Sequence, residues 1–230
     1  MKNVPPQAAM KFYLLGENAA VMQSCVALDL DCQRRIWAMA QLFLSENQCL
    51  DVVPGMNNLT LIFDPELQQG SALLERLMSL WERIEAEQFT PREVVIPVQY
   101  GGELGPDLAH VAEHVGMSEQ AVITAHSAAV YVVYFLGFQP GFAYLGGLPA
   151  SLATPRRAEP RLTVPAGSVG IGGQQTGIYP AQSPGGWQII GRTDVRLFDV
   201  QRSQPSFLQS GDVVRFVAVD ATQQCGVEHA

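Results

Sequence analysis

Three closely spaced arginines are the residues of this sequence best suited to binding chemistry. Arg156, Arg157 and Arg161 lie in the proline-flanked segment TPRRAEPRLTVP. Guanidinium groups this close repel one another unless an anion or a carboxylate lies between them, and their planar shape fits carboxylates and phosphates. The segment indicates either an anion-binding site or a salt-bridged surface loop in which Glu159 pairs with one arginine. We carry all three arginines forward as candidate binding residues.

A glycine-rich segment, SVGIGGQQTG, follows the arginines at residues 168–177. Glycine allows main-chain amides to approach a ligand closely, and successive amides can bind an anion. Tight turns at the corners of a barrel are the alternative explanation. No helix is expected directly after the segment, so it does not match a dinucleotide-binding fingerprint. The candidate contacts to a substrate amide or a phosphate are Gly172, Gly173, Gln174, Gln175 and Thr176.

Two aromatic residues and one histidine have both a structural and a functional interpretation. Tyr179 and Trp187 are residues of the kind found in cores, and either can also form the floor of a pocket for a planar ligand. His126 ends a predicted helix, where an imidazole can bond to the last carbonyls, and it is also our candidate catalytic proton carrier. A Ser-His-Asp triad in the downstream region is not supported, because His229 is the only histidine beyond His126.

Residues His110 to His114 spell HVAEH, which fits the H-x-x-E-H pattern of certain zinc peptidases. On a helix the two imidazoles lie one turn apart, but a catalytic zinc needs a third protein ligand and we identify none. A solvated helix face is the favoured interpretation. We therefore predict no metal site on this chain.

The charge composition excludes several classes of function. The 230 residues carry a formal net charge of -8, which disfavours a nucleic-acid partner because nucleic-acid binding needs a basic face. Lys2 and Lys11 are the only lysines. A phosphate-binding P-loop, a protein kinase and a biotin or Schiff-base carrier each depend on a lysine that the rest of the chain does not contain. A phosphate must therefore be bound by arginine, main-chain amides, a metal or a partner.

Cysteine spacing and hydropathy favour a cytoplasmic location. The four cysteines lack C-x-x-C spacing, which is typical of reduced thiols. The first residues do not follow the pattern of a signal peptide. The longest apolar run, residues 128–138, is too short to span a bilayer core of about 30 Å. We expect a cytoplasmic protein with no membrane partner.

The elements that must position these residues fall into two groups. Up to about Pro91 the hydrophobic pattern gives two strands, a helix, two strands and a second helix. Asp29 and Asp31 are placed to cap the first helix and complement its dipole. We predict an α/β sandwich domain over residues 1–91. Its predicted helices span 28–44 and 71–84, and its predicted strands span 10–15, 19–24, 50–53 and 59–63.

Past Pro91 the pattern changes to one strand, two short helices and then many short strands. Pro106 and Ser118 support the starts of the helices, as first-turn proline and as cap. Short strands among glycine and proline turns favour a closed barrel or a sandwich, since closure removes exposed edges. The predicted fold class is α+β, with a second domain over residues 92–230. Its predicted helices span 106–115 and 118–126, and its strands 94–98, 129–138, 162–164, 168–171, 178–179, 187–190, 195–198 and 213–219.

Several long motifs resemble one protein family. FLGFQPGFAYLGGLP, TPRRAEPRLTVPAGSVGIGGQQTGIYP and PGGWQIIGRT are similar to the signature blocks of the family of the 5-oxoprolinase B subunit, also called the KipI or allophanate hydrolase subunit 1 family. VVPGMNNLTLIFDP and IPVQYGGELGPDL match the same family, so the resemblance covers nearly the whole chain. It implies a small N-terminal α/β domain followed by a cyclophilin-like β-barrel.

The resemblance also implies partners and a cofactor. Family members work with a homologous C subunit of the KipA type and with an A subunit, in a 5-oxoprolinase complex that opens 5-oxoproline to L-glutamate while hydrolysing ATP. The expected cofactor is therefore ATP in the complex, which leaves open a divalent metal alongside it, with no biotin on this chain. The chain alone is expected to be inactive.

Two alternative functions come from the same family. One kind of member inhibits autophosphorylation of a sensor histidine kinase, which would then be the partner. Related domains form the carboxyltransferase part of a urea carboxylase. The resemblance does not carry site residues over to this sequence, so the candidates remain those argued above from the residues.

Overall fold

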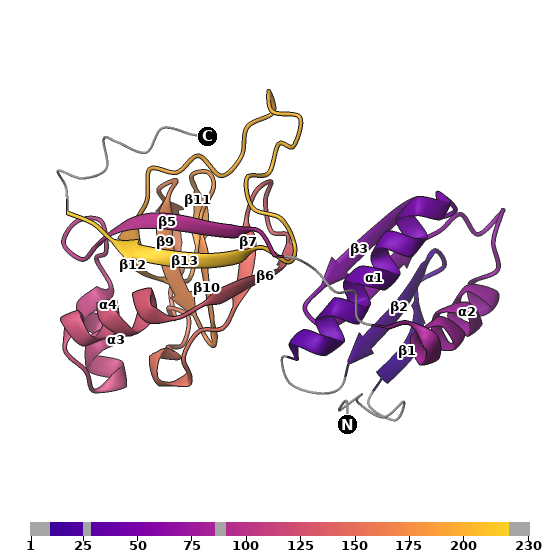
Figure 1. Cartoon of the computed structure of the whole chain (residues 1–230), viewed down its shortest axis with the longest axis horizontal. Helices are drawn as coiled ribbons and strands as arrows, with labels where there is room; N and C mark the ends of the chain where they lie inside the picture. Colours follow the sequence, from indigo (N-terminus) through magenta and orange to yellow (C-terminus); the bar gives the residue numbers. More distant parts are fainter. Residues whose placement is uncertain (1–9, 25–28, 86–90, 221–230) are drawn as a thin grey trace. The chain divides into compact units, whose positions relative to one another are not determined.

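The computed structural model describes residues 10–24, 29–85 and 91–220, and it divides into two compact units, Met1–Thr90 and Pro91–Ala230. Figure 1 shows the helices and strands of the two units, and each unit has its own hydrophobic core. No helix among the described residues is long and apolar enough to cross a membrane.

The first unit is an antiparallel sheet with two helices on one face. The sheet order is β1-β2-β4-β3. One core contains residues of the sheet and of both helices, so the helices cover the same face. Asp29 caps the first helix as predicted, because its carboxylate accepts a hydrogen bond from the main-chain N–H of Cys32 at 2.6 Å. The elements are β1 Met10–Leu15, β2 Ala19–Ser24, α1 Leu30–Glu46, β3 Asp51–Gly55, β4 Asn58–Ile62 and α2 Gly70–Arg83.

The second unit is a closed seven-stranded barrel in the order β10-β7-β6-β13-β5-β12-β9. Only the β13-β5 pair is parallel, and the other neighbouring pairs of the barrel are antiparallel. The strands are β5 Glu93–Tyr100, β6 Tyr131–Leu136, β7 Ala143–Gly146, β9 Ser168–Gly172, β10 Gln175–Ile178, β12 Gln188–Arg192 and β13 Val213–Ala218. The predicted α+β fold class with a closed β structure is confirmed.

Two helices and a small separate sheet complete this unit. The helices α3 Leu108–Val115 and α4 Glu119–Ala128 lie together beside the barrel (Figure 1), and the short 3-10 helix η2 spans Ala150–Leu152. The helices add side chains such as Val111 and Val122 to the core of the barrel. The strands β8 Arg161–Val164 and β11 Ser183–Gly185 pair only with each other, so the arginine segment leads into a two-stranded sheet beside the barrel.

One predicted strand, at residues 195–198, is wrong. This segment belongs to the long connection between β12 and β13, where Phe198 makes only an isolated bridge to Ser206. The main-chain N–H of Val195 donates to the hydroxyl of Thr193 at 3.3 Å, which offers the backbone a local partner in place of a ladder.

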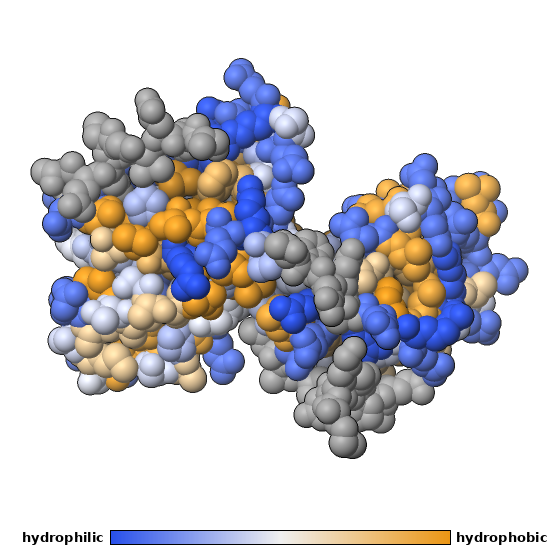
Figure 2. All heavy atoms as spheres, viewed as in Figure 1, coloured by the Kyte–Doolittle hydropathy of each residue, from blue (hydrophilic) through white to orange (hydrophobic). Residues whose placement is uncertain are grey.

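The outer wall of the barrel carries a small apolar area. Val95 on β5 and Val217 on β13 lie on the same face of the parallel pair, and both are exposed. Figure 2 shows apolar residues over these two strands. The polar candidate residues lie elsewhere in this unit, around α3, β8 and β12.

Candidate functional site

The arginine segment is organised by a buried carboxylate, that of Asp107. Arg161 donates to it from Nη1 at 2.8 Å and from Nη2 at 2.7 Å, and Arg157 donates from Nη1 at 3.1 Å. The main-chain N–H of Ile189 donates to the same carboxylate at 2.6 Å. The side chain of Asp107 is only 5% exposed. This arrangement explains how two neighbouring guanidinium groups can lie close together in an acidic protein.

Asp107 occupies the residue before α3, where a carboxylate commonly caps the helix. Here it makes no side-chain cap hydrogen bond. Its oxygens instead receive the two arginines and the β12 amide. Asp107 therefore ties the start of α3 to the arginine segment and to β12.

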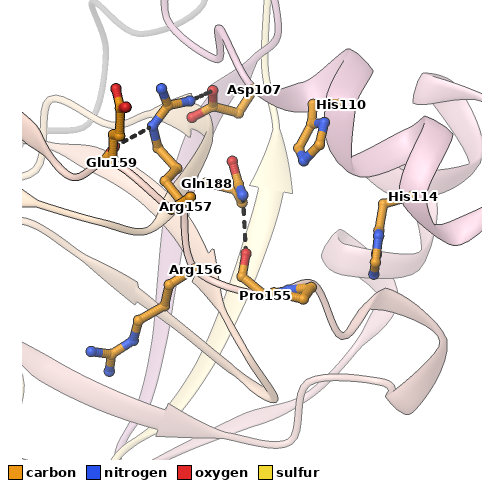
Figure 3. Close-up of a pocket in the computed structure, with 9 residues that line it drawn as sticks. Asp107, His110, His114, Pro155, Arg156, Arg157, Glu159 and Gln188 are labelled. Carbon is orange, nitrogen blue, oxygen red and sulfur yellow. Dashed lines mark hydrogen bonds and ion pairs between the residues drawn. The ribbon is translucent and has the colours of Figure 1, made fainter.

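A pocket of about 620 Å³ lies beside this carboxylate (Figure 3). This volume falls in the range of small-molecule sites. α3 supplies His110 and His114, and the loop after η2 supplies two of the predicted arginines. The residues that line the pocket are Asp107, His110, His114, Pro155, Arg156, Arg157, Ala158, Glu159 and Gln188.

Gln188 is the buried polar side chain of the pocket. It lies at the start of β12 and is 3% exposed. Its Nε2 donates to the carbonyl of Pro155 at 3.0 Å, whereas its Oε1 has no hydrogen-bond partner among the described residues. Figure 3 shows the amide nitrogen toward Pro155 and the oxygen on the opposite side, toward the part of the pocket that holds Arg157 and Asp107.

The three predicted arginines have different environments. Arg157 is held by Asp107 and also donates from Nε to the carbonyl of Glu159 at 3.3 Å. Arg161 forms the bidentate pair with Asp107 and is not a lining residue. Arg156 is exposed, has no carboxylate partner in the described part of the chain, and lies 5.9 Å from the ring centroid of Trp187. In Figure 3 its side chain points away from Asp107.

Trp187 and Tyr179 lie in an aromatic cluster that also contains Phe142. Both are nearly buried, and the ring of Phe142 packs edge-on against each of them. Burial raises the pKa of the Tyr179 phenol, and a hydrogen bond with the Trp187 backbone opposes that shift. Neither aromatic is a lining residue of the pocket, so they support the barrel wall next to Arg156.

The glycines of the segment 168–177 allow this tryptophan to lie against the strands. A Cβ on Gly172 would lie 2.5 Å from Nε1 of Trp187, and a Cβ on Gly177 would lie 3.1 Å from the same ring. Gly173 has φ +67° in the turn between β9 and β10. Its N–H donates to Thr154, and its carbonyl accepts from the N–H of Thr154. The main chain of Gly173 is therefore already paired, and the glycines serve packing and the turn.

The two glutamines of the same segment lie apart from the arginines. Gln174 is exposed in the turn, and Gln175 is half-buried at the start of β10. Neither is a lining residue of the pocket. A role for them in binding stays a prediction.

His126 and Thr176 form a hydrogen-bonded group in the barrel interior. The Thr176 hydroxyl donates to the carbonyl of Gly170 at 2.9 Å, so its oxygen accepts from Nε2–H of His126, also at 2.9 Å. Nδ1 of His126 then accepts from the hydroxyl of Tyr100 at 2.8 Å. His126 is fully buried, and this burial lowers its pKa to about 3. The imidazole is therefore neutral at pH 7 and is not a lining residue of the pocket.

The histidines of the HVAEH motif are exposed on α3, as predicted for a solvated helix face. They are nevertheless pocket residues, which the motif alone did not indicate. Within the described residues no cluster of three or more His, Cys, Asp or Glu side chains could hold a metal ion. The motif therefore contributes imidazoles to the pocket.

The structure brings together only part of the predicted set. Arg156 and Arg157 line the pocket, and Arg161 joins them through Asp107. Sequence reasoning missed Asp107 and Gln188. Asp107 has the sequence signal of an ordinary helix start, and Gln188 is a single polar residue at the start of an apolar strand. Asp107 and Gln188 become recognisable as pocket residues only when the fold brings α3, β12 and the arginine segment together.

Comparison with known proteins gives consistent matches over most of the chain. Residues 10–208 match the family described as carboxyltransferase domain, subdomain C and D. The chain is 53% identical over 205 residues to the B subunit of 5-oxoprolinase from Escherichia coli O157:H7 and 48% identical over 208 residues to the protein of that name from Haemophilus influenzae. These matches cover 89% and 90% of this chain, and 94% and 97% of the relatives.

Solved structures share the fold. TTHA0988 matches with a TM-score of 0.76 and 37% identity, over 88% of this chain and 40% of that chain. PH0987 from Pyrococcus horikoshii matches with a TM-score of 0.57 and 41% identity, over 93% of this chain and 99% of that chain. The K. lactis urea amidolyase matches with a TM-score of 0.79 over 94% of this chain and 15% of that chain, and at 19% identity it shows a common fold alone.

Proposed function

The chain belongs to the family of the 5-oxoprolinase B subunit, and from this membership we propose that it is a subunit of an ATP-dependent 5-oxoprolinase. The observation that carries the proposal is 53% identity over 94% of a relative of that name. The complex opens the five-membered lactam of 5-oxoproline to L-glutamate while ATP is hydrolysed. ATP drives the reaction because a lactam carbon is a poor electrophile until its oxygen is phosphorylated.

The complex that we propose also contains a homologous C subunit of the KipA type and an A subunit, and this chain is inactive alone. The residues that line its pocket include no hydroxyl or thiol side chain that could act as a nucleophile. In TTHA0988 the matching fold occupies 40% of a longer chain, so it occurs there joined to further polypeptide. Both observations support a chain that supplies part of a shared site.

In this proposal the substrate site is shared between subunits, and this chain contributes the pocket beside Asp107. Arg157 has a position fixed by Asp107, and Arg156 adds a positive charge that no carboxylate of the described residues neutralises. A fixed guanidinium suits the carboxylate of 5-oxoproline. His126, the candidate proton carrier from the sequence, has a structural role in this proposal because its imidazole is fully buried and bonded to Tyr100 and Thr176.

ATP, with any divalent metal that accompanies it, is bound with groups from the partner subunits. The sequence has no lysine beyond Lys11 and therefore has no P-loop lysine to hold a triphosphate. We place the complex in the cytoplasm, where ATP is available and where free thiols such as Cys32 and Cys49 stay reduced.

Co-purification tests the proposal. A tagged copy of this chain is expected to retain the untagged A and C subunits, and the eluate is expected to convert 5-oxoproline and ATP to glutamate and ADP. A tagged chain that retains neither of them, together with a fully active mixture of the other two polypeptides, would contradict it. The free chain serves as the control and is expected to produce no glutamate.

A further inference from the structure

The pocket contains a buried hydrogen-bond acceptor that nothing in the described part of the chain satisfies. Gln188 is 3% exposed, and its Oε1 has no partner. Buried polar atoms in proteins are nearly always paired, because an unpaired buried acceptor loses its hydrogen bonds to water. A pocket residue with such an atom indicates a ligand that brings a donor.

The orientation of the Gln188 side-chain amide is fixed by the hydrogen bond that its Nε2 makes. Nε2 donates to the carbonyl of Pro155 at 3.0 Å, and a flipped amide would place two acceptors against each other. Oε1 therefore faces the side of the pocket where Figure 3 shows Arg157 and Asp107. The ligand atom opposite Oε1 must be an N–H or an O–H.

The charge around the pocket defines the rest of the ligand. The lining residues include two arginines, Arg156 and Arg157, and two carboxylates, Asp107 and Glu159. Arg161 adds one positive charge through its pair with Asp107. The set therefore has a net charge of one positive, which balances a ligand with a single carboxylate and is too little for a triphosphate.

Arg157 has a donor left for that carboxylate. Its Nη1 is bonded to Asp107 and its Nε to the carbonyl of Glu159, whereas its Nη2 makes no hydrogen bond to a described residue. A guanidinium held in this way loses little conformational freedom when it binds an anion.

We propose that the pocket binds a lactam that carries one carboxylate, with the ring N–H donating to Oε1 of Gln188 and the carboxylate accepting from Arg157. This rests on the proposed function, in which the lactam is 5-oxoproline, and makes Gln188 the residue that distinguishes a lactam from a lactone. A site built to accept from a ligand N–H rejects an analogue that lacks it, because the acceptor is then left unpaired.

The test compares two ligands that differ only in the N–H group. 5-Oxoproline and its lactone analogue, 5-oxotetrahydrofuran-2-carboxylate, are titrated against the free chain by calorimetry and against the assembled complex as substrate or inhibitor. The wild-type protein is expected to prefer the lactam at least tenfold, and 2-pyrrolidinone, which lacks the carboxylate, is expected to bind at least tenfold more weakly than 5-oxoproline.

The preference is expected to depend on Gln188. Gln188→Met keeps the length of the side chain but removes the acceptor, and the ratio between lactam and lactone is expected to fall to within about twofold. Gln120→Met is the matched control, because Gln120 is exposed on α4 and does not line the pocket, so the ratio is expected to stay at the wild-type value. Thermal melting checks that both variants fold.

The outcomes separate this inference from the proposed function. Equal affinity of the wild-type protein for lactam and lactone overturns the inference, as does no binding of 5-oxoproline to either chain or complex. ATP that displaces 5-oxoproline from the free chain also overturns it, since the pocket then belongs to the nucleotide. A complex that opens 5-oxoproline without the lactam preference retains the function alone, whereas a lactam preference in a chain that supports no turnover retains the pocket alone.

Discussion

Asp107 is the residue on which the arrangement of the arginine segment depends. One carboxylate receives two guanidinium groups and a main-chain N–H, and it is almost fully buried. Arg157 and Arg161 consequently differ in what they can do. Arg161 uses both of its Nη atoms on Asp107, whereas Arg157 contributes only Nη1, and its Nη2 makes no hydrogen bond to a described residue.

Asp107→Asn is expected to lower the free energy of unfolding by about 3 kcal/mol. The substitution replaces a buried carboxylate by a neutral amide, so that Arg157 and Arg161 lose the negative charge they share. Urea denaturation measures this difference. Glu93→Gln is the control, since the Glu93 and Arg215 side chains form an exposed pair at 3.9 Å and such pairs contribute about 1 kcal/mol or less. Equal losses in the two variants would contradict the organising role of Asp107.

Arg157→Ala is expected to reduce the kcat/KM of the assembled complex for 5-oxoproline at least tenfold, equivalent to about 1.4 kcal/mol of transition-state stabilisation. The fold should remain, because Arg161 keeps its bidentate pair with Asp107. Steady-state kinetics with a melting curve for each protein gives the answer. Arg83→Ala, on an exposed helix position of the first unit, is the control, and wild-type kinetics in Arg157→Ala would place that arginine outside the substrate site.

Stability is expected to fall as the pH falls below about 6.5, through His126. In the folded chain burial lowers the pKa of His126 to about 3, whereas an unfolded histidine titrates near 6.5. Between these values only the unfolded chain takes up the proton, so the free energy of unfolding falls by about 1.4 kcal/mol per pH unit. Urea denaturation at pH 7.5, 6 and 5 measures the slope.

The matched variants for this slope are His126→Gln and His110→Gln. The first removes the buried imidazole and should flatten the pH dependence, whereas the second removes an exposed one and should leave it in place. The interpretation of His126 as a neutral core group would be lost if both variants kept the wild-type slope.

At the scale of the elements, the sequence predicted the features that depend on the local residue pattern. The helix cap at Asp29 and the closed β structure follow from residues near one another in the chain or from repeated strand and turn signals. The prediction of a strand at 195–198 was wrong, because the hydrogen bond from the main-chain N–H of Val195 to the hydroxyl of Thr193 competes with strand pairing. The pocket lies between a helix start and a loop that are 50 residues apart, which no periodicity describes.

The glycine-rich segment had two interpretations from its sequence, an anion-binding loop or tight turns at the corners of a barrel. Gly173 lies in the turn between β9 and β10 and its main-chain N–H pairs with Thr154, which agrees with the second interpretation at this residue. Gly172 and Gly177 have no side chain, and this leaves the space in which the ring of Trp187 packs. The residues of the segment alone do not predict that Trp187 packs against it.

Gly172→Ala is expected to destabilise the second unit by about 1 to 3 kcal/mol, because the new Cβ would lie 2.5 Å from Nε1 of Trp187 and the wall must shift. Gly186→Ala is the control, since its nearest neighbour would be at an ordinary 3.6 Å. Thermal melting and Trp fluorescence report on the change. A Gly172→Ala protein as stable as Gly186→Ala would show that the tryptophan is not packed as described.

At the scale of the whole molecule, the chain is a two-unit protein that covers nearly the full length of its named relatives from Escherichia coli and Haemophilus influenzae. The domain limits 1–91 and 92–230 stay a prediction. In TTHA0988 and in the urea amidolyase of K. lactis the same fold is a smaller part of a longer chain.

The most direct test is a titration of this chain into a fixed amount of the A and C subunits with saturating 5-oxoproline and ATP, measuring glutamate and ADP. The account predicts that glutamate formation is absent without the chain and rises with each addition until it reaches a plateau. Glutamate formation at the full rate before any of the chain is added would contradict it.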